Sequence, residues 1–262
     1  MNTVDLWLGD SWTIGSELNL TSKQEVLKGL PTAKVSKRIP HVSDSANPML
    51  AYAGIISQEQ NRKFYNFGKS GGSFQFMLYE LIRYIKNFNN PDTQTNVFVQ
   101  TTGQIRWFAG QSFTTIGHHQ TGWDVTLVDD LTSPHSITRF QNIAVENIRD
   151  YEKTLKDIGE EPDYSIYNTT IVLNNIYSLC KQYNFNLSII PVWVEFEMFD
   201  QVNLIPDDVW LLPHNKTILE EVTGKKFLDI LDDPKYIIEE SLGHPNKETH
   251  KLIADYITSC LY

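Results

Sequence analysis

The sequence predicts an α/β fold with a mainly parallel central sheet, and two observations support this prediction. Short apolar segments that are typical of buried strands occur at residues 4–9, 95–102 and 186–193. Segments whose apolar residues recur at helical spacing lie between and after these strands. Buried strands that alternate with amphipathic helices form βαβ units, so we expect their strands to run parallel in one sheet.

The first half of the chain supplies two strands and one helix. "VDLWLG" (4–9) reads as a largely buried strand, and "TNVFVQTT" (95–102) as a second one. Between them we expect a helix over 73–87, with Ser73 as its N-cap. One face of that helix collects the apolar residues Phe74, Met77, Leu78, Leu81, Ile82 and Ile85.

The second half supplies a third strand and three helices. We expect helices over 138–157, around 166–183 and near 246–260, and a buried strand at 186–193, "NLSIIPVW". The two cysteines, Cys180 and Cys260, fall on the apolar stripes of two of these helices. Both therefore read as small core residues, and no disulfide framework is predicted.

Two long segments, 102–137 and 194–245, show no clear element and read as loops that extend over the end of the sheet. The first contains four aromatic residues, Trp107, Phe108, Phe113 and Trp123. These side chains either stack on sugar rings or form a small satellite core. The second segment has twelve acidic residues against four lysines between Glu195 and Glu240, which is typical of a solvated face.

The composition limits which binding partners and which cellular compartment we expect for this protein. The chain has 262 residues, of which 41% are hydrophobic, and we expect one domain over 1–262. A net charge of −10 argues against nucleic acid as a partner. The start "MNTVDLWLGD" lacks the features of a signal peptide, and no apolar run is long enough for a membrane span. We expect a cytoplasmic protein without a membrane partner, with association with a virus particle as the alternative.

Ser11 is the first candidate for chemistry. "GDS" follows the first strand and "TTGQIR" follows the second, so both segments reach the edge where parallel sheets place their ligand sites. A serine hydroxyl needs a base to become a nucleophile. His244 is suited to this role, because it lies in a Gly-Pro-flanked turn before the last helix, which Asn246 can cap. His250, inside that helix, reads as a packing or hydrogen-bonding residue.

Three short blocks resemble the SGNH (GDSL-type) hydrolases, in matching order along the chain. They are "GDSWTIGSEL", "NFGKSGGS" (66–73) and "HPNKETHKLIADYI". The resemblance implies a flavodoxin-like three-layer α/β/α fold and hydrolysis of esters through an acyl-serine. It makes Ser11 the nucleophile and His244 the base. Backbone N–H groups of Ser11 and Gly71 would line the oxyanion hole.

Two positions depart from the family pattern. Gln104, in "VQTTGQIRW", stands where the third block has an oxyanion-binding Asn, and its amide offers the same donor on a longer side chain. Thr102 and Arg106 in this block are similar to those of some phage-encoded members. Ser241 stands where the family places the catalytic Asp.

The nearest acidic residue to that position is Glu240, and Asp233 is a more distant candidate for the third catalytic member. Without an acid, Ser11 and His244 would act as a dyad. The predicted substrate-binding residues flank the nucleophile and the third block: Asp10, Trp12, Thr102, Arg106 and Trp107. Asp10 is also expected to hydrogen-bond within the turn.

The sequence thus predicts a serine hydrolase that cleaves carboxylic esters, with a small-molecule or carbohydrate ester as substrate and an acetylated carbohydrate as one candidate. The two changed positions support an alternative, a weakly active or inactive carbohydrate-binding or structural module on the same scaffold. No cofactor or metal is predicted, because the adjacent pair His118 and His119 lacks Cys or carboxylate partners at ligand spacing.

Overall fold

A computed structural model of the chain describes residues 2–15, 18, 47–68, 72–102, 107–109, 114–119, 122–127, 161–192, 198, 200–213, 216–231, 233–238 and 244–261. Of residues 107–109, 114–119, 122–127 and 161–165 it describes the backbone course only. Within these ranges no helix is both long and apolar enough to cross a membrane.

The central sheet has four parallel strands in the order β2-β1-β3-β7. Their bounds are Asn2–Leu8 for β1, Lys63–Asn66 for β2, Thr93–Gln100 for β3 and Asn186–Ile190 for β7. In the register of β1, Leu6 pairs with Tyr65 of β2 and with Val97 of β3. The predicted α/β fold with a parallel sheet is confirmed.

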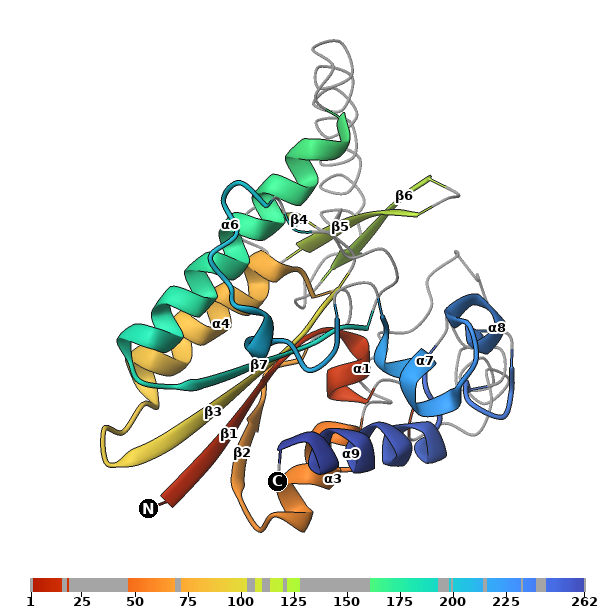
Figure 1. The fold of residues 1–262 in the computed structure, drawn as a ribbon, viewed down its shortest axis with the longest axis horizontal. Helices are drawn as coiled ribbons and strands as arrows, with labels where there is room; N and C mark the ends of the chain where they lie inside the picture. The colour runs from red at the N-terminus through yellow and green to blue at the C-terminus, as the bar shows by residue number, and fades with distance from the viewer. Residues whose placement is uncertain are drawn as a thin grey trace, which may run out of the picture.

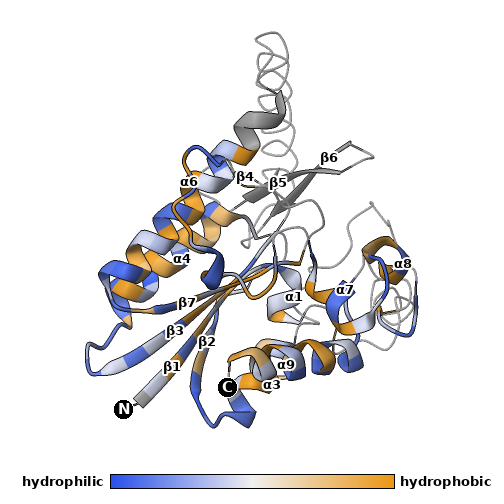
Figure 2. Ribbon diagram, viewed as in Figure 1, coloured by the Kyte–Doolittle hydropathy of each residue, from blue (hydrophilic) through white to orange (hydrophobic). Residues whose placement is uncertain are grey.

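Alternation along the strands builds two separate cores. Leu6 and Leu8 of β1 and Val97 and Val99 of β3 pack into the core on one face of the sheet. Trp7 of β1 and Phe98 of β3 point to the other face, where their rings stack at a centroid distance of 4.0 Å. Because successive side chains of a strand point to opposite faces, a strand buried on both sides is apolar throughout. Figure 2 shows this continuous apolar character at the centre of the sheet.

Helices cover both faces of the sheet and complete three layers (Figure 1). α4 (Phe74–Asn87) packs against α6 (Glu161–Gln182) on one face, and α3 (Tyr52–Glu59) packs against α9 (Lys247–Leu261) on the other. The expected α/β/α arrangement is therefore present, with β1 and β3 at its centre.

Individual predictions for the helices hold with two exceptions. The Ser73 side chain caps α4 by accepting a hydrogen bond from the backbone N–H of Phe76. Cys180 is buried as predicted. Cys260, in the last turn of α9, is exposed instead of buried. The prediction that Ile82 lies on the buried face of this helix is also wrong, because Ile82 is 47% exposed.

Several elements were not expected from the sequence. α1 (Ser11–Ile14), α3 and β2 lie in the stretch between the first strand and residue 73. The segment predicted as an irregular loop at 102–137 contains an antiparallel sheet of β4 (Trp107–Ala109), β5 (Thr114–His119) and β6 (Gly122–Leu127). β5, "TTIGHH", contains one apolar residue and gives no hydrophobic period, whereas β6, "GWDVTL", does alternate apolar and polar residues at Trp123, Val125 and Leu127.

The acidic segment 194–245 also contains short helices. They are the 3₁₀ helix η2 (Asp207–Val209), α7 (Ile218–Thr223) and α8 (Phe227–Leu231). Thr217 and Glu220 form a capping box at the start of α7, a signal that "TILE" carries in the sequence. The predicted helix over 138–157 lies outside the described residues.

Candidate active site

The candidate site lies where the strand order reverses. The chain passes from β1 to β2 on one side and returns to β3 on the other. In such sheets the loops after the two strands that flank this point diverge and leave a crevice, which is the usual ligand site. Gly9 and Asp10 follow β1 there and lead into Ser11, and Thr101 and Thr102 follow β3.

Ser11 begins the short helix α1, and Asp10 holds the start of this helix. One carboxylate oxygen of Asp10 accepts a hydrogen bond from the backbone N–H of Trp12 at 3.0 Å. The carbonyl oxygen of Asp10 accepts the N–H of Ile14 at 3.3 Å. The helix ends after one turn at Gly15, which adopts the left-handed conformation with φ of 71°. Ser11 is thus fixed in a tight turn with 7% of its surface exposed.

Gly9 allows the close approach of β1 and α1. A Cβ atom at position 9 would lie 1.9 Å from Oγ1 of Thr13 and 3.0 Å from Cβ of Gln100. No side chain can occupy that space without moving α1 away from the end of β3. The glycine of "GDS" therefore sets the distance between the turn at Ser11 and the neighbouring strand.

Asp10 is buried, and its carboxylate is joined to β3 as well as to α1. The oxygen that accepts a hydrogen bond from the Trp12 N–H also accepts one from Nε2 of Gln100, at 2.6 Å. The second oxygen accepts the Thr102 hydroxyl at 3.1 Å. A buried carboxylate is stable when several donors surround it, and here three donors come from two segments. These contacts confirm the expected hydrogen bonding of Asp10 within the turn.

Gln100 and Tyr52 extend this group of hydrogen bonds beneath α1. Oε1 of Gln100 accepts the Thr13 hydroxyl at 2.5 Å and the Tyr52 hydroxyl at 2.8 Å. The two hydroxyl oxygens lie 2.9 Å apart. Because Oε1 faces two hydroxyls, Nε2 must face Asp10, which fixes the orientation of the amide. Burial raises the pKa of Tyr52, so its hydroxyl remains protonated and able to donate.

His250 joins this group to α9. Its Nδ1 accepts the backbone N–H of Tyr52, the first residue of α3, at 3.2 Å, and the two rings stack at 5.7 Å. Ala51, the N-cap of α3, makes no side-chain cap, so the imidazole of His250 supplies the missing acceptor. Burial, followed by the charge of the nearby His244, lowers the pKa of His250 to about 3. His250 is therefore a neutral imidazole at physiological pH.

His244 lies in a turn that the preceding segment holds in place. The carbonyl oxygen of His244 accepts the N–H of Ile238 at 2.9 Å, and Pro245 forms a β-bridge with Ile237. Asn246 caps α9 by accepting the N–H of Thr249 at 2.9 Å, as predicted. The side chain of His244 is 6% exposed. His244 is thus buried in the turn that leads into α9.

Asn66, in the second motif block, fixes the other end of α1. Its Nδ2 donates to the carbonyl oxygen of Thr13 at 2.7 Å, and its Oδ1 accepts the N–H of Gly68 at 2.9 Å. The C-terminal carbonyls of a short helix lack intrahelical partners, so a side-chain donor stabilises them. The asparagine of this block therefore positions the turn that begins at Ser11.

The remaining predicted site residues divide into three groups. Trp12 is 3% exposed and packs in the core on the α3–α9 face. Asp233, the distant candidate for a catalytic acid, forms an exposed ion pair with Lys225 at 2.6 Å. Five residues lie outside the described ranges, as does the side chain of Trp107: Gly71, Gln104, Arg106, Glu240 and Ser241. Their roles stay predictions.

Three residues of the site were not singled out from the sequence, namely Tyr52, Asn66 and Gln100. Gln100 carries a signal, because a glutamine that ends the apolar run "VFVQ" is a polar group at a buried position. Tyr52 carries none, since α3 itself was not predicted. Within the described residues, no group of three or more His, Cys, Asp or Glu side chains is arranged to hold a metal ion.

Comparisons with known proteins give structural matches only. A scan against family models and a search of curated proteins found no match. Among solved structures, a lipolytic G-D-S-L family protein from Veillonella parvula DSM 2008 matches with 12% identity and a TM-score of 0.39, over 99% of this chain and 98% of that chain.

Two esterases match at similar levels. Esterase EstA from Pseudoalteromonas sp. has 14% identity and a TM-score of 0.39, over 100% of this chain and 97% of its own. A carbohydrate esterase family 2 enzyme with a carbohydrate-binding domain, from Corynascus thermopiles, has 10% identity and a TM-score of 0.42, over 99% of this chain and 66% of its own. The matched structures thus include G-D-S-L family proteins, the group that the sequence motifs resemble, and carbohydrate esterases.

Proposed function

We propose that this protein is a serine hydrolase that cleaves carboxylic esters, with Ser11 as nucleophile and His244 as base. The observation that carries the proposal is the construction of the α1 turn. Asp10, Asn66 and Gln100 hold a four-residue helix at the crevice end of β1, with a serine as its first residue. So many buried hydrogen bonds around one turn are costly to assemble and are typical of a preorganised site.

In the proposed mechanism, the imidazole of His244 takes the proton of the Ser11 hydroxyl as its oxygen attacks the ester carbon. The alcohol leaves after it receives this proton, and water then attacks the acyl-serine to release the acid. The N–H of Trp12 is occupied by Asp10, so the oxyanion is assigned to the N–H of Ser11, with Gly71 and the Gln104 amide as the further donors. Each such donor contributes roughly 100- to 1000-fold to the rate.

The proposed substrate is a small acyl ester, with an acetyl group on a carbohydrate as the first candidate. The aromatic residues of the 102–137 segment, among them Trp107 and Trp123, motivate the carbohydrate. The acidic segment before His244 disfavours a polyanion as the alcohol half, because like charges repel at the rim of the site.

The experiment compares wild-type protein with Ser11→Ala in the turnover of p-nitrophenyl acetate and butyrate. We expect the variant to lose at least about 1000-fold in kcat, because the nucleophile is removed. Ser259→Ala is the matched control: this serine is in the last turns of α9, where its hydroxyl donates to the carbonyl oxygen of Tyr256. A fluorophosphonate should label wild type and Ser259→Ala, and leave Ser11→Ala unlabelled.

One observation favours a second candidate function, a carbohydrate-binding or structural module on a hydrolase scaffold. Ser241 replaces the residue that would orient the base, and a misoriented histidine costs on the order of 10,000-fold in rate. Equal residual rates for wild type and Ser11→Ala, with no labelling of either, would contradict the esterase and support this module.

A further inference from the structure

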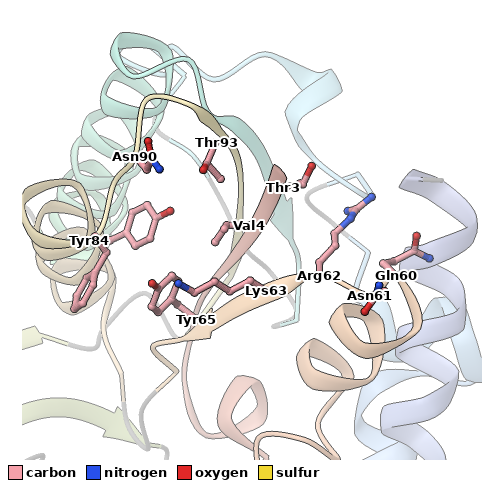
Figure 3. A pocket seen from close by; sticks show the side chains of 11 residues that line it. Thr3, Val4, Gln60, Asn61, Arg62, Lys63, Tyr65, Tyr84, Asn90 and Thr93 are labelled. Carbon is pink, nitrogen blue, oxygen red and sulfur yellow. The ribbon is translucent and has the colours of Figure 1, made fainter. Parts of the chain in front are cut away.

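A hollow lies at the end of the central sheet opposite to Ser11, where the strands begin. It is an open cavity of about 630 Å³, formed where β1, β2 and β3 begin and by the turns that precede β2 and β3. Figure 3 shows Thr3 and Val4 of β1 at its back, Lys63 and Tyr65 of β2 along one side and Tyr84 of α4 facing them. Ser11 follows the other end of β1, so the cavity is distinct from the candidate active site.

The charge of this cavity is opposite to that of the chain. Its lining includes Arg62 and Lys63, and none of the described residues that line it is Asp or Glu. Nη1 of Arg62 lies 3.6 Å from a carboxylate oxygen of buried Asp5, which offsets the charge of the guanidinium. The Lys63 ammonium extends over the Tyr65 ring, 4.9 Å from its centroid. Of the two cations among the described residues that line the cavity, Lys63 is the more exposed, and we assign it to the ligand.

Three aromatic rings form one wall. Tyr65 contacts Tyr84 edge to face at 5.4 Å and Phe88 at 5.4 Å. Tyr84 donates to or accepts from the hydroxyl of Thr95 at 3.1 Å. These contacts hold the rings rigidly, so their faces and edges form a preformed apolar surface next to a cation.

Neutral polar side chains form the rest of the rim, including Thr3, Asn61, Asn90 and Thr93. Thr3 belongs to β1, and two tight turns present the others. Asn61 adopts a left-handed conformation with φ of 50° after α3, and the N–H of Arg62 bonds to the carbonyl oxygen of Ser57 at 2.8 Å. In the other turn, the N–H of Thr93 bonds to the carbonyl oxygen of Asn90 at 2.9 Å. Asn tolerates the left-handed region, so the first turn is built without strain.

We propose that this cavity binds an anionic sugar, with its acid group at the Lys63 ammonium and its ring against the tyrosine wall. The combination selects this class. A planar aromatic acid would not use the amide and hydroxyl rim, and a neutral sugar would not use the lysine. Carboxylated and phosphorylated sugars share the required chemistry, so the test includes one of each. Binding here is independent of Ser11 and of ester hydrolysis.

The experiment is a titration of isotope-labelled protein, followed by backbone amide shifts in NMR, with methyl β-glucuronide, glucose 6-phosphate and methyl β-glucoside. We expect both anionic probes to shift amides of residues 60–65 and 88–93, and the neutral glucoside to bind at least about tenfold more weakly. The tighter of the two anions identifies carboxylate or phosphate as the preferred group. Shifts confined to the Ser11 and His244 segments, or equal binding of the glucoside, would overturn the proposal.

Matched lysine variants test the contact itself. Lys63→Met should weaken the binding of the preferred anion about tenfold, and Lys63→Arg should retain most of it. Lys181→Met is the control, because Lys181 also extends over a tyrosine ring, Tyr177 at 5.3 Å, but does not line the cavity. Thermal unfolding of each variant checks that the fold is intact. Unchanged affinity in Lys63→Met would exclude this lysine as the anion contact and overturn the proposal.

Discussion

The hydroxyl oxygen of Tyr52 lies 2.9 Å from Oγ1 of Thr13, two residues after Ser11 in α1. The same Tyr52 donates its backbone N–H to His250 in α9. One residue of α3 thus contacts both α1, which begins at Ser11, and α9, which follows His244. This double contact joins the two helices, and it can be tested one hydrogen bond at a time.

Removal of the Thr13 hydroxyl should loosen the turn that begins at Ser11. Thr13→Val keeps the shape of the side chain, but deprives Tyr52 and Gln100 of a partner. We expect a loss of about 1–2 kcal/mol in the free energy of unfolding and a fall in kcat for p-nitrophenyl acetate with little change in KM. Thr13→Ser retains the hydroxyl and should behave like wild type. A change in KM alone, with kcat unchanged, would contradict a role in positioning.

Neutralisation of Asp10 should be more costly. In Asp10→Asn the amide oxygen can still accept from the Trp12 N–H and Gln100 Nε2, but the amide is uncharged and its N–H₂ group faces the Thr102 hydroxyl, which must then accept instead of donate. We expect a loss of about 2–3 kcal/mol in stability, measured by urea unfolding, because charged hydrogen bonds are lost in a buried site. Asp208→Asn, at an exposed position in η2, is the control and should unfold like wild type.

His250 should make the protein less stable in mild acid. Its pKa falls from the ordinary value of 6.5 to about 3 in the folded protein, because burial disfavours the imidazolium. Between these values the unfolded chain binds one more proton at this position, so stability falls as the pH falls through that window. The slope from one such group is about 1.4 kcal/mol per pH unit. In His250→Gln this part of the slope should disappear, as measured by urea unfolding at a series of pH values.

The two cysteines should differ sharply in reactivity. Cys260 is exposed at the end of α9, whereas Cys180 is buried in α6 and burial raises the pKa of its thiol to about 12. Because the thiolate is the reactive form, DTNB should modify one thiol in the native protein and two after denaturation. Cys260→Ser should abolish the native reaction and Cys180→Ser should leave it unchanged. Rapid native modification of Cys180 would show that the α4–α6 face opens readily.

The parts of the fold that could be predicted are those with a strong apolar period. Phe98 and Val99 alternate between two cores in a strand buried on both faces, and α4 has a capping serine and an apolar face, so both elements stand out in the sequence. β5 contains one apolar residue, and α3 is short and contains Gly54, so neither produces a clear period, whereas the alternation of Trp123, Val125 and Leu127 in β6 is a strand signal.

In the candidate site, too, only the residues that belong to a local sequence pattern could be predicted. Ser11 and His244 could be identified because they lie in short motifs with a fixed order along the chain. Tyr52 and Gln100 could not be assigned, because their importance depends on contacts between positions 48 residues apart. A buried hydrogen bond between distant segments leaves no local pattern, so the polar group that supports the site is visible only once the strands are paired.

The central position of β1 has a consequence for biosynthesis. β1 pairs with β3, whose residues are translated about ninety positions later. The backbone N–H of Tyr52 bonds to the ring of His250, which is translated 198 positions after Tyr52. Sheets built from such distant pairings form slowly, because the intervening chain must be ordered first. The turn that contains Ser11 is therefore translated well before α9 and reaches its final geometry only after α9 is in place, so fragments that end before α9 should lack an ordered α1 turn.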